Sequence, residues 1–237
     1  MTRWRAMAAA LLVTAGPAVA GPYEDAQVSF KHGDYAAAAQ GFLQGAQQGN
    51  FLAQAALGAM YVEGLGVPRD PAAAAAWFRP AAEHGLAAAQ YNPAALYHKG
   101  DGVPRDYAQA RQWYVRAAEQ GDTSAQFSLA VMYRLGQGVK QDYGEAAQWF
   151  RRAADRGDGL SQLSLGLMYR WGQGVPRDDV QSYMWFGLAS SSSTPGRADA
   201  KRIRSEAEHH RSELEARMPP ERVATARELA KIWTPRN

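Results

Sequence analysis

Apolar positions along the chain recur with helical spacing, and the helices they predict come in pairs that repeat every 36 residues. Within the segment 50–85, one apolar face consists of Ala53, Leu57, Met60 and Tyr61. A second face follows, consisting of Ala74, Trp77, Phe78, Ala81 and Ala82, and we expect Trp77 to supply its largest buried surface. The pattern predicts an all-α chain of helix-turn-helix units, in which each unit buries its apolar faces against its neighbours.

The residues between the two faces predict where each helix ends and begins. Gly64 stands where the first helix should end in a left-handed residue, which glycine adopts without steric cost. Asp70 is expected to cap the second helix, with Pro71 at its first position. The intervening Gly-x-Gly-Val loop occurs four times, starting at Gly64, Gly100, Gly136 and Gly172. The loop is therefore explained as a helix end and a turn.

The repeat pattern divides the chain into segments. Four full units cover 50–190, and a weaker copy without the loop covers 21–49, where we expect an amino-terminal capping repeat. A linker at 191–197 follows, and 198–237 is expected to form carboxy-terminal helices. The first of these, 198–217, is mostly charged, with a sparse apolar face of Ile203, Ala207, His210, Leu214 and Met218. The second, 221–233, is suited to covering the open end of the stack.

These residues resemble the Sel-1-like repeat family, which is related to the tetratricopeptide repeats. The positions that match its pattern are Ala53, Leu57, Gly58, Tyr61, Gly64, Gly66, Val67, Asp70, Ala74, Trp77, Ala81 and Ala82. The resemblance covers about 23–190 and implies an α/α right-handed superhelical solenoid of 36-residue helix-turn-helix repeats. It also implies a role as a scaffold or adaptor, typically in bacterial envelope or signalling assemblies.

Two prolines depart from the repeat pattern. Pro80 stands where other units have Arg116 and Arg152, and Pro93 stands where they have a leucine. A proline inside a helix removes one backbone hydrogen bond and costs about 3 kcal/mol. Two interpretations follow: a hinge that alters the curvature of the array, or local drift in a fold that confines such damage to one repeat. We favour the second interpretation.

The first twenty residues have the pattern of a signal peptide. Arg3 and Arg5 precede an apolar run from 6 to 15, and the small residues Ala18-Val19-Ala20 follow Gly16-Pro17. The run is too short to span a bilayer as a mature helix. We therefore expect an exported protein, periplasmic in preference to secreted, with no transmembrane segment in the mature chain.

Composition excludes several functional classes. The chain has no cysteine, so it has no disulfides, thiol nucleophile or thiolate metal site. Its net charge of +3 falls to +1 when the two arginines of the signal peptide are removed (3 − 2), which argues against a nucleic-acid partner. These observations favour a protein that relies on helix packing for its stability.

Candidate binding residues lie just before each Gly-x-Gly-Val loop, where the repeats differ most. In solenoids of the family that the chain resembles, the first helices line the concave face. We expect that face to bind a partner peptide or helix, through His98, Lys99, Arg134, Arg170 and Trp171. The arginines would pair with carboxylates of the partner. The alternative for Trp171 is packing against the following helices.

Other functions have less support in the sequence. Some cysteine-rich relatives are described as β-lactamases, but this chain lacks their paired cysteines and the Ser-x-x-Lys and Lys-Thr-Gly strings. Glu206, His209 and His210 have ligand-like spacing, but on a charged helix they indicate a solvated face. We expect no catalytic residue, cofactor or metal. A cell-wall glycan held by Tyr91, Arg170 and Trp171 remains an alternative partner. The prediction is a non-enzymatic protein-interaction scaffold of the bacterial envelope.

Overall fold

A computed structural model describes residues 21–192 and 199–235. The predicted signal peptide and most of the predicted linker lie outside these residues. The described parts contain helices and no strand, so the all-α prediction is confirmed. The helices are α2 (Pro22–Lys31), α3 (Tyr35–Gln47), α4 (Phe51–Glu63), α5 (Pro71–Glu83), α6 (Ala87–Lys99), α7 (Tyr107–Glu119), α8 (Thr123–Leu135), α9 (Tyr143–Asp155), α10 (Gly159–Trp171), α11 (Asp179–Ser191), α12 (Ala200–Glu215) and α13 (Pro220–Ile232).

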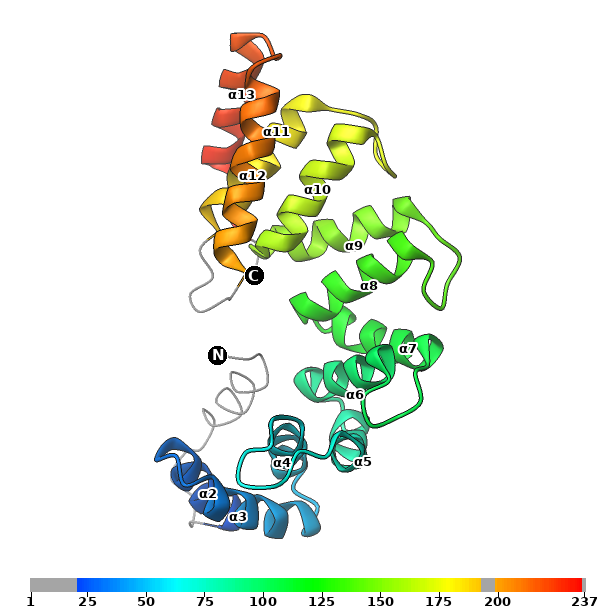
Figure 1. The fold of residues 1–237 in the computed structure, drawn as a ribbon, viewed down its shortest axis with the longest axis vertical. Coiled ribbons are helices and arrows are strands. Elements are labelled where there is room, and N and C mark those ends of the chain that lie inside the picture. Colours follow the sequence, from blue (N-terminus) through cyan, green and yellow to red (C-terminus); the bar gives the residue numbers. More distant parts are fainter. Residues whose placement is uncertain (1–20, 193–198, 236–237) are drawn as a thin grey trace. The chain divides into compact units, whose positions relative to one another are not determined.

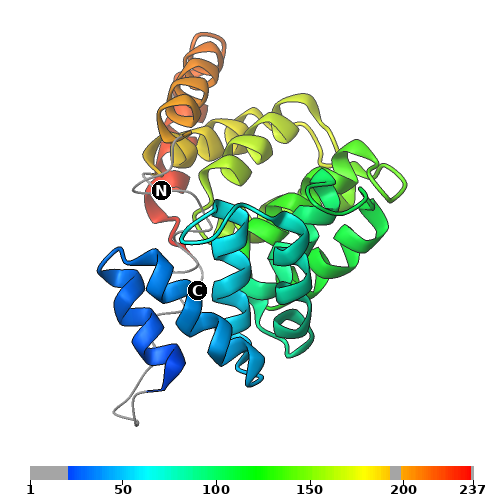
Figure 2. The ribbon, with the colours of Figure 1, turned by 60° about the horizontal axis from the view of Figure 1, so that its bottom comes forward.

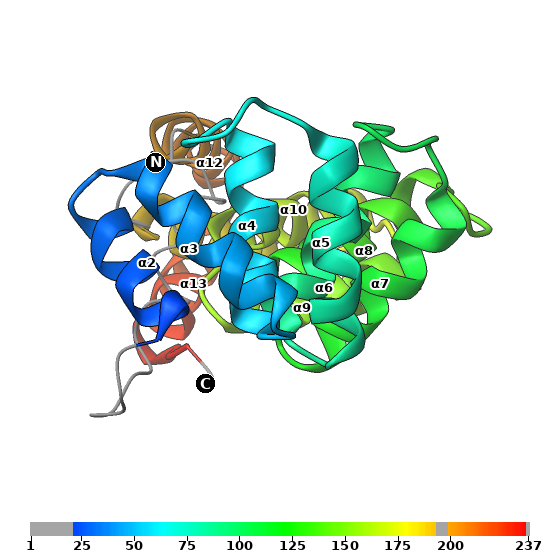
Figure 3. The same ribbon diagram turned by 90° about the horizontal axis from the view of Figure 1, so that it is seen from below.

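The chain forms two compact units, of which unit 1 ends at Asp122 and unit 2 begins at Thr123. In unit 1 the helices pack in consecutive pairs, α2 with α3, α4 with α5 and α6 with α7, and each pair also contacts the next (Figures 1 and 3). In unit 2, α8 packs with α9 and α10 with α11, while α12 and α13 both pack against α11 (Figures 1 and 2). The helix-turn-helix repeat predicted from the 36-residue period is therefore present in both units.

The helices begin and end at the residues that the sequence predicts. The Asp70 carboxylate accepts hydrogen bonds from the backbone amides of Ala72 and Ala73, both at 3.0 Å, and so caps α5. Gly64 ends α4 in the left-handed conformation, with φ of 69°. The same left-handed glycine ends α6 at Gly100 and α10 at Gly172.

The second glycine of the loop has a role that the turn alone does not explain, as Gly66 and Gly174 show. A Cβ added at Gly66 would lie 2.0 Å from the carbonyl oxygen of Tyr35, at the start of the second helix of the preceding pair. In unit 2, a Cβ at Gly174 would lie 2.0 Å from the carbonyl oxygen of Tyr143. These two loops therefore pack directly on the backbone of the preceding repeat, where no side chain fits.

Each of the four repeat tryptophans is followed by a buried aromatic residue, which in the first full repeat is more completely buried than the tryptophan itself. Phe78 is 0% exposed, whereas Trp77 is only partly buried. Gly58 makes room for the ring, because a Cβ there would lie 2.7 Å from it. The equivalent buried rings are Tyr114, Phe150 and Phe186. The Phe78 ring packs against Gly58 on α4, the first helix of its own repeat, and is therefore buried within the helix pair.

The two unusual prolines lie inside helices that continue through them. Pro80 is within α5 and Pro93 is within α6, and neither helix ends at its proline. At the position of Pro80, other repeats place a guanidinium over their tryptophan, Arg116 at 4.7 Å from the Trp113 ring and Arg152 at 4.4 Å from the Trp149 ring. A proline has no guanidinium, so Pro80 cannot cover Trp77 in this way, although α5 continues through it.

The predicted carboxy-terminal helices correspond to α12 and α13, and each contributes an apolar face. Ile203, Ala207 and Leu214 of α12 are buried, as are Val223 and Ala226 of α13. They form one cluster with Tyr183 and Phe186 of α11. The segment therefore covers the apolar face that α11, as the last helix of the repeats, would otherwise expose.

Candidate partner-binding site

The five predicted binding residues lie at the carboxyl ends of first helices. His98 and Lys99 end α6 in unit 1, whereas Arg134 of α8 and both Arg170 and Trp171 of α10 belong to unit 2. Each end is followed by the loop whose glycines fix its position.

In unit 1, His98 packs inside the repeat. Its ring is half-buried and lies edge-on to Tyr107 and Tyr114, with ring centroids 5.3 and 5.9 Å away. These contacts hold α6 against its partner helix α7. Lys99, the next residue, is exposed.

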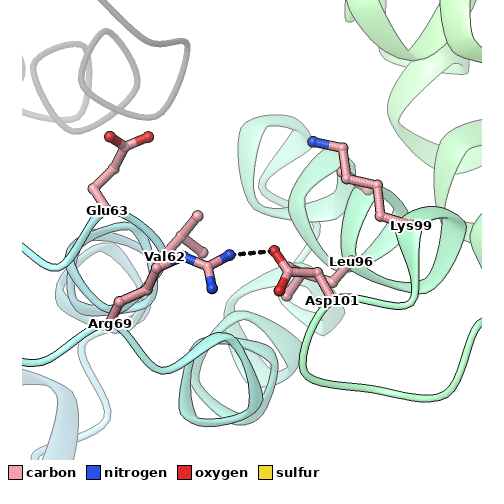
Figure 4. A pocket seen from close by; sticks show the side chains of 7 residues that line it. Val62, Glu63, Arg69, Leu96, Lys99 and Asp101 are labelled. Atoms are coloured by element: carbon pink, nitrogen blue, oxygen red, sulfur yellow. Dashed lines mark hydrogen bonds and ion pairs between the residues drawn. The ribbon is translucent and has the colours of Figure 1, made fainter.

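Lys99 lines a pocket of about 310 Å³ between the carboxyl ends of α4 and α6 (Figure 4). Arg69 and Asp101 come from the loops that follow these helices and form an ion pair at 2.5 Å across the pocket. The Glu63 and Lys99 side chains both extend to the upper side of this pair in the view of Figure 4. An exposed ion pair contributes about 1 kcal/mol or less to stability. The Arg69 and Asp101 side chains could therefore turn from each other to a ligand at little cost in stability.

In unit 2, Arg170 is already paired within the chain. Its side chain is 13% exposed, and Nη1 donates to Oε2 of Glu213 at 2.7 Å. The same nitrogen lies 2.9 Å from Nδ1 of His210, which is itself 3.3 Å from Oε2 of Glu213. Without a proton Nδ1 of His210 accepts from Arg170, and with a proton on that nitrogen it donates to Glu213. The hydrogen bond from Arg170, followed by that from His210, lowers the pKa of Glu213 to about 2.

Beside this cluster, Trp171 presents most of its ring to solvent. Its side chain is 56% exposed, although the ring lies edge-on to His210 at 6.3 Å and under the Arg170 guanidinium at 5.8 Å. Leu135, at the equivalent position of the preceding repeat, is 53% exposed. Arg134 beside it is exposed, and its side chain forms no hydrogen bond or ion pair with the described residues. The structure thus combines both interpretations of Trp171, partial packing and an open face.

Sequence reasoning missed that α12 supplies the partners of Arg170. The predicted grouping of Glu206 with the two histidines does not form this cluster; the structure brings Glu213 to His209 and His210, with potential ligand atoms within 4.8 Å. Arg170 already engages His210 and Glu213, so its positive charge occupies the place that a metal cation would need. The placement of His210 on the predicted apolar face of its helix was the available signal that it points inward.

Stacked helix pairs with a recurring loop define a helical repeat protein, a class that acts through extended surfaces. The Sel1 repeat pattern matches residues 52–86, 87–122, 123–158 and 159–193, and the chain belongs to this family. Sel1 repeat proteins are generally protein-interaction scaffolds, and the fold is typically non-catalytic.

Two solved structures resemble the chain in both sequence and fold. A Sel1 repeat protein from Oxalobacter formigenes is 29% identical with a TM-score of 0.66, over 88% of this chain and 98% of that one. A protective antigen of uropathogenic Escherichia coli strains that displays an SLR fold is 30% identical with a TM-score of 0.54, over 90% of this chain. The match spans 52% of that antigen's length. No curated protein sequence matches the chain. None of the helices in the described residues is long and apolar enough to cross a membrane.

Proposed function

We propose that this chain is a non-enzymatic scaffold of the bacterial cell envelope that binds a peptide or helix of a partner protein. The proposed contact surface is the end of the first helices in unit 2, formed by Arg134, Leu135 and Trp171. Arg170 supports this surface from behind, because its hydrogen bonds to α12 fix the end of α10.

The observation that carries the proposal is the exposure of two large apolar side chains at one repeat position. Leu135 and Trp171 are 36 residues apart, and each leaves more than half of its surface in water. Tryptophan and arginine are enriched among residues that dominate binding energy, and a partner that covered both apolar groups would remove them from water. Arg134 would then be placed to pair with a carboxylate of the partner.

The envelope location rests on the first twenty residues. Arg3 and Arg5, the short apolar run and Ala18-Val19-Ala20 are the features of a cleavable signal peptide. The mass of the protein recovered from a periplasmic extract tests this directly. Cleavage before Gly21 would support export, whereas a full-length chain found only in the cytoplasm would refute it.

The binding surface is tested by crosslinking in cells followed by purification of the chain. The test variant is Leu135→Ser/Trp171→Ser, and the control is Ile232→Ser, which changes another exposed apolar side chain of unit 2. All three proteins should unfold at similar temperatures, since none of these side chains is buried. We expect a discrete partner protein to be lost from the test variant by at least tenfold and retained by the control.

Two results would contradict this surface. Undiminished capture by the double variant would place binding elsewhere on the chain. Binding to purified peptidoglycan fragments, without any enriched protein, would favour a glycan partner instead.

A further inference from the structure

A second groove in unit 1 is lined mainly by the second helices α5 and α7. It has a volume of about 550 Å³ and is lined by side chains of α5 and α7, together with Tyr97 of α6 and Pro104 of the following loop. Trp113 forms part of the wall and is only partly buried. Arg79 is exposed and donates to the Tyr97 hydroxyl at 3.3 Å. The groove therefore combines an aromatic wall with polar groups, as ligand sites commonly do.

The same set of residues recurs 72 positions later, in unit 2. Six of the seven lining residues are identical there, and the seventh changes only from Glu83 to Asp155. The identical ones are Arg79, Tyr97, Pro104, Asp106, Gln109 and Trp113, which correspond to Arg151, Tyr169, Pro176, Asp178, Gln181 and Trp185. Unit 2 thus offers a second arrangement of the same residues for comparison.

In unit 2 the equivalent tryptophan is completely covered. Trp185 is 0% exposed, and the Arg151 guanidinium lies 4.7 Å from its ring centroid while also donating to the Tyr169 hydroxyl at 2.5 Å. The Trp233 ring lies edge-on to Trp185, with centroids 6.3 Å apart and planes at 74°. Edge-to-face pairs at this distance are favourable arrangements of aromatic rings. Trp233 follows the last turn of α13, so the chain's own tail supplies this covering ring.

In unit 1 no aromatic ring of the described residues packs against Trp113 as Trp233 packs against Trp185. Arg116 covers Trp113 from 4.7 Å, but Arg79 points to Tyr97 and the adjoining groove stays open. Glu83 and Gln109 line this space and offer carbonyl or carboxylate oxygens that could accept a hydrogen bond from an indole N–H.

We propose that the Arg79–Tyr97–Trp113 groove binds a tryptophan side chain of another protein, presented just after a helix. The occupant is the same kind of side chain that packs on the equivalent Trp185 in unit 2, where Trp233 of the chain's own tail supplies it. A second copy of this chain is a poorer candidate, because its Trp233 is already packed on Trp185 and would have to be released first. The groove is separate from the surface formed by Arg134, Leu135 and Trp171, so the two proposals can fail independently.

The test uses a fluorescein-labelled synthetic peptide with the sequence of residues 228–235, which contains Trp233. Its binding to the purified chain is measured by fluorescence anisotropy. In the variant Gln109→Trp, an exposed residue of the groove is replaced by a ring that fills it. The matched control is Gln112→Trp, which places the same ring at another exposed glutamine of α7 that does not line the groove.

We expect saturable binding to the unmodified chain and to Gln112→Trp, with affinity at least tenfold lower for Gln109→Trp. A peptide with alanine in place of tryptophan should also bind at least tenfold more weakly. Equal binding to Gln109→Trp, or no saturable binding to the unmodified chain, would overturn the proposal. So would sedimentation showing that the chain self-associates and that Trp233→Ala abolishes the association, because the occupant would then be a second copy.

Discussion

Glu213 of α12 accepts a hydrogen bond at 2.7 Å from Arg170, which lies 43 residues earlier on α10. The contact joins the repeats of unit 2 to the aperiodic segment that follows them. It also changes the role of a residue predicted to bind a partner. The Arg170 guanidinium is used within the chain, which leaves Arg134 as the arginine that can meet a partner's carboxylate at this surface.

We expect Arg170→Glu to lower the melting temperature by roughly 2–4 °C, because it places two carboxylates where an ion pair stands. The double variant Arg170→Glu/Glu213→Arg restores opposite charges and should recover most of this loss. Thermal unfolding followed by circular dichroism measures both changes. A double variant no more stable than the single one would show that the charge pairing contributes nothing.

The ion pair of Arg170 with Glu213 also predicts that the stability of the folded chain depends on pH. The pKa of Glu213 falls from its ordinary value of 4.5 to about 2 in the folded chain, first because of the Arg170 hydrogen bond and then because of His210. A depressed folded-state pKa gives stabilisation that is present above pH 4.5 and is lost as the pH falls toward 2. The stability difference between the unmodified chain and Glu213→Gln should therefore shrink across this range in urea titrations. A constant difference from pH 6 to pH 2 would contradict the assignment.

The sequence predicts the repeated parts of the fold well, because each structural requirement there is local and recurs. Gly64 and Asp70 mark a helix end and a helix start by their own backbone and side-chain chemistry. The contact of Arg170 with Glu213 could not be predicted in this way, since α12 has no repeat partner that fixes its register. Trp113 and Trp185 occupy the same repeat position, yet only Trp185 is fully buried, and it contacts both the Arg151 guanidinium and the Trp233 ring. The Trp233 contact comes from the aperiodic segment, so the repeat pattern does not predict it.

Gly174 and Gly157 allow two reasons for a glycine to be separated experimentally: a positive φ and a lack of room for a Cβ. Gly174 and Gly157 both have positive φ, 69° and 86°, but a Cβ at Gly174 would lie 2.0 Å from the Tyr143 carbonyl, whereas one at Gly157 would meet nothing within 4 Å. Gly157→Ala should cost about 1–2 kcal/mol from backbone strain alone. Gly174→Ala should cost at least about 2 kcal/mol more, because the loop must also move away from α9. Urea unfolding measures both, and equal costs would show that the loop is free to shift.

Pro80 offers a substitution that should stabilise unit 1. Its ring removes the amide that would bond to the carbonyl of Ala76 and clashes with that carbonyl, a defect of about 3 kcal/mol in an ordinary helix. Pro80→Ala should recover part of this amount, roughly 1–3 kcal/mol, because the surrounding helix has already adapted to the ring. Pro80→Arg should add about 0.5–1 kcal/mol more, by placing a guanidinium over Trp77 as Arg116 lies over Trp113. Comparing the two variants by urea unfolding separates the backbone effect from the cation–π contact. If neither variant is more stable than the unmodified chain, the helix accommodates the proline without cost. If Pro80→Arg and Pro80→Ala have equal free energies of unfolding, a guanidinium over Trp77 contributes nothing to stability.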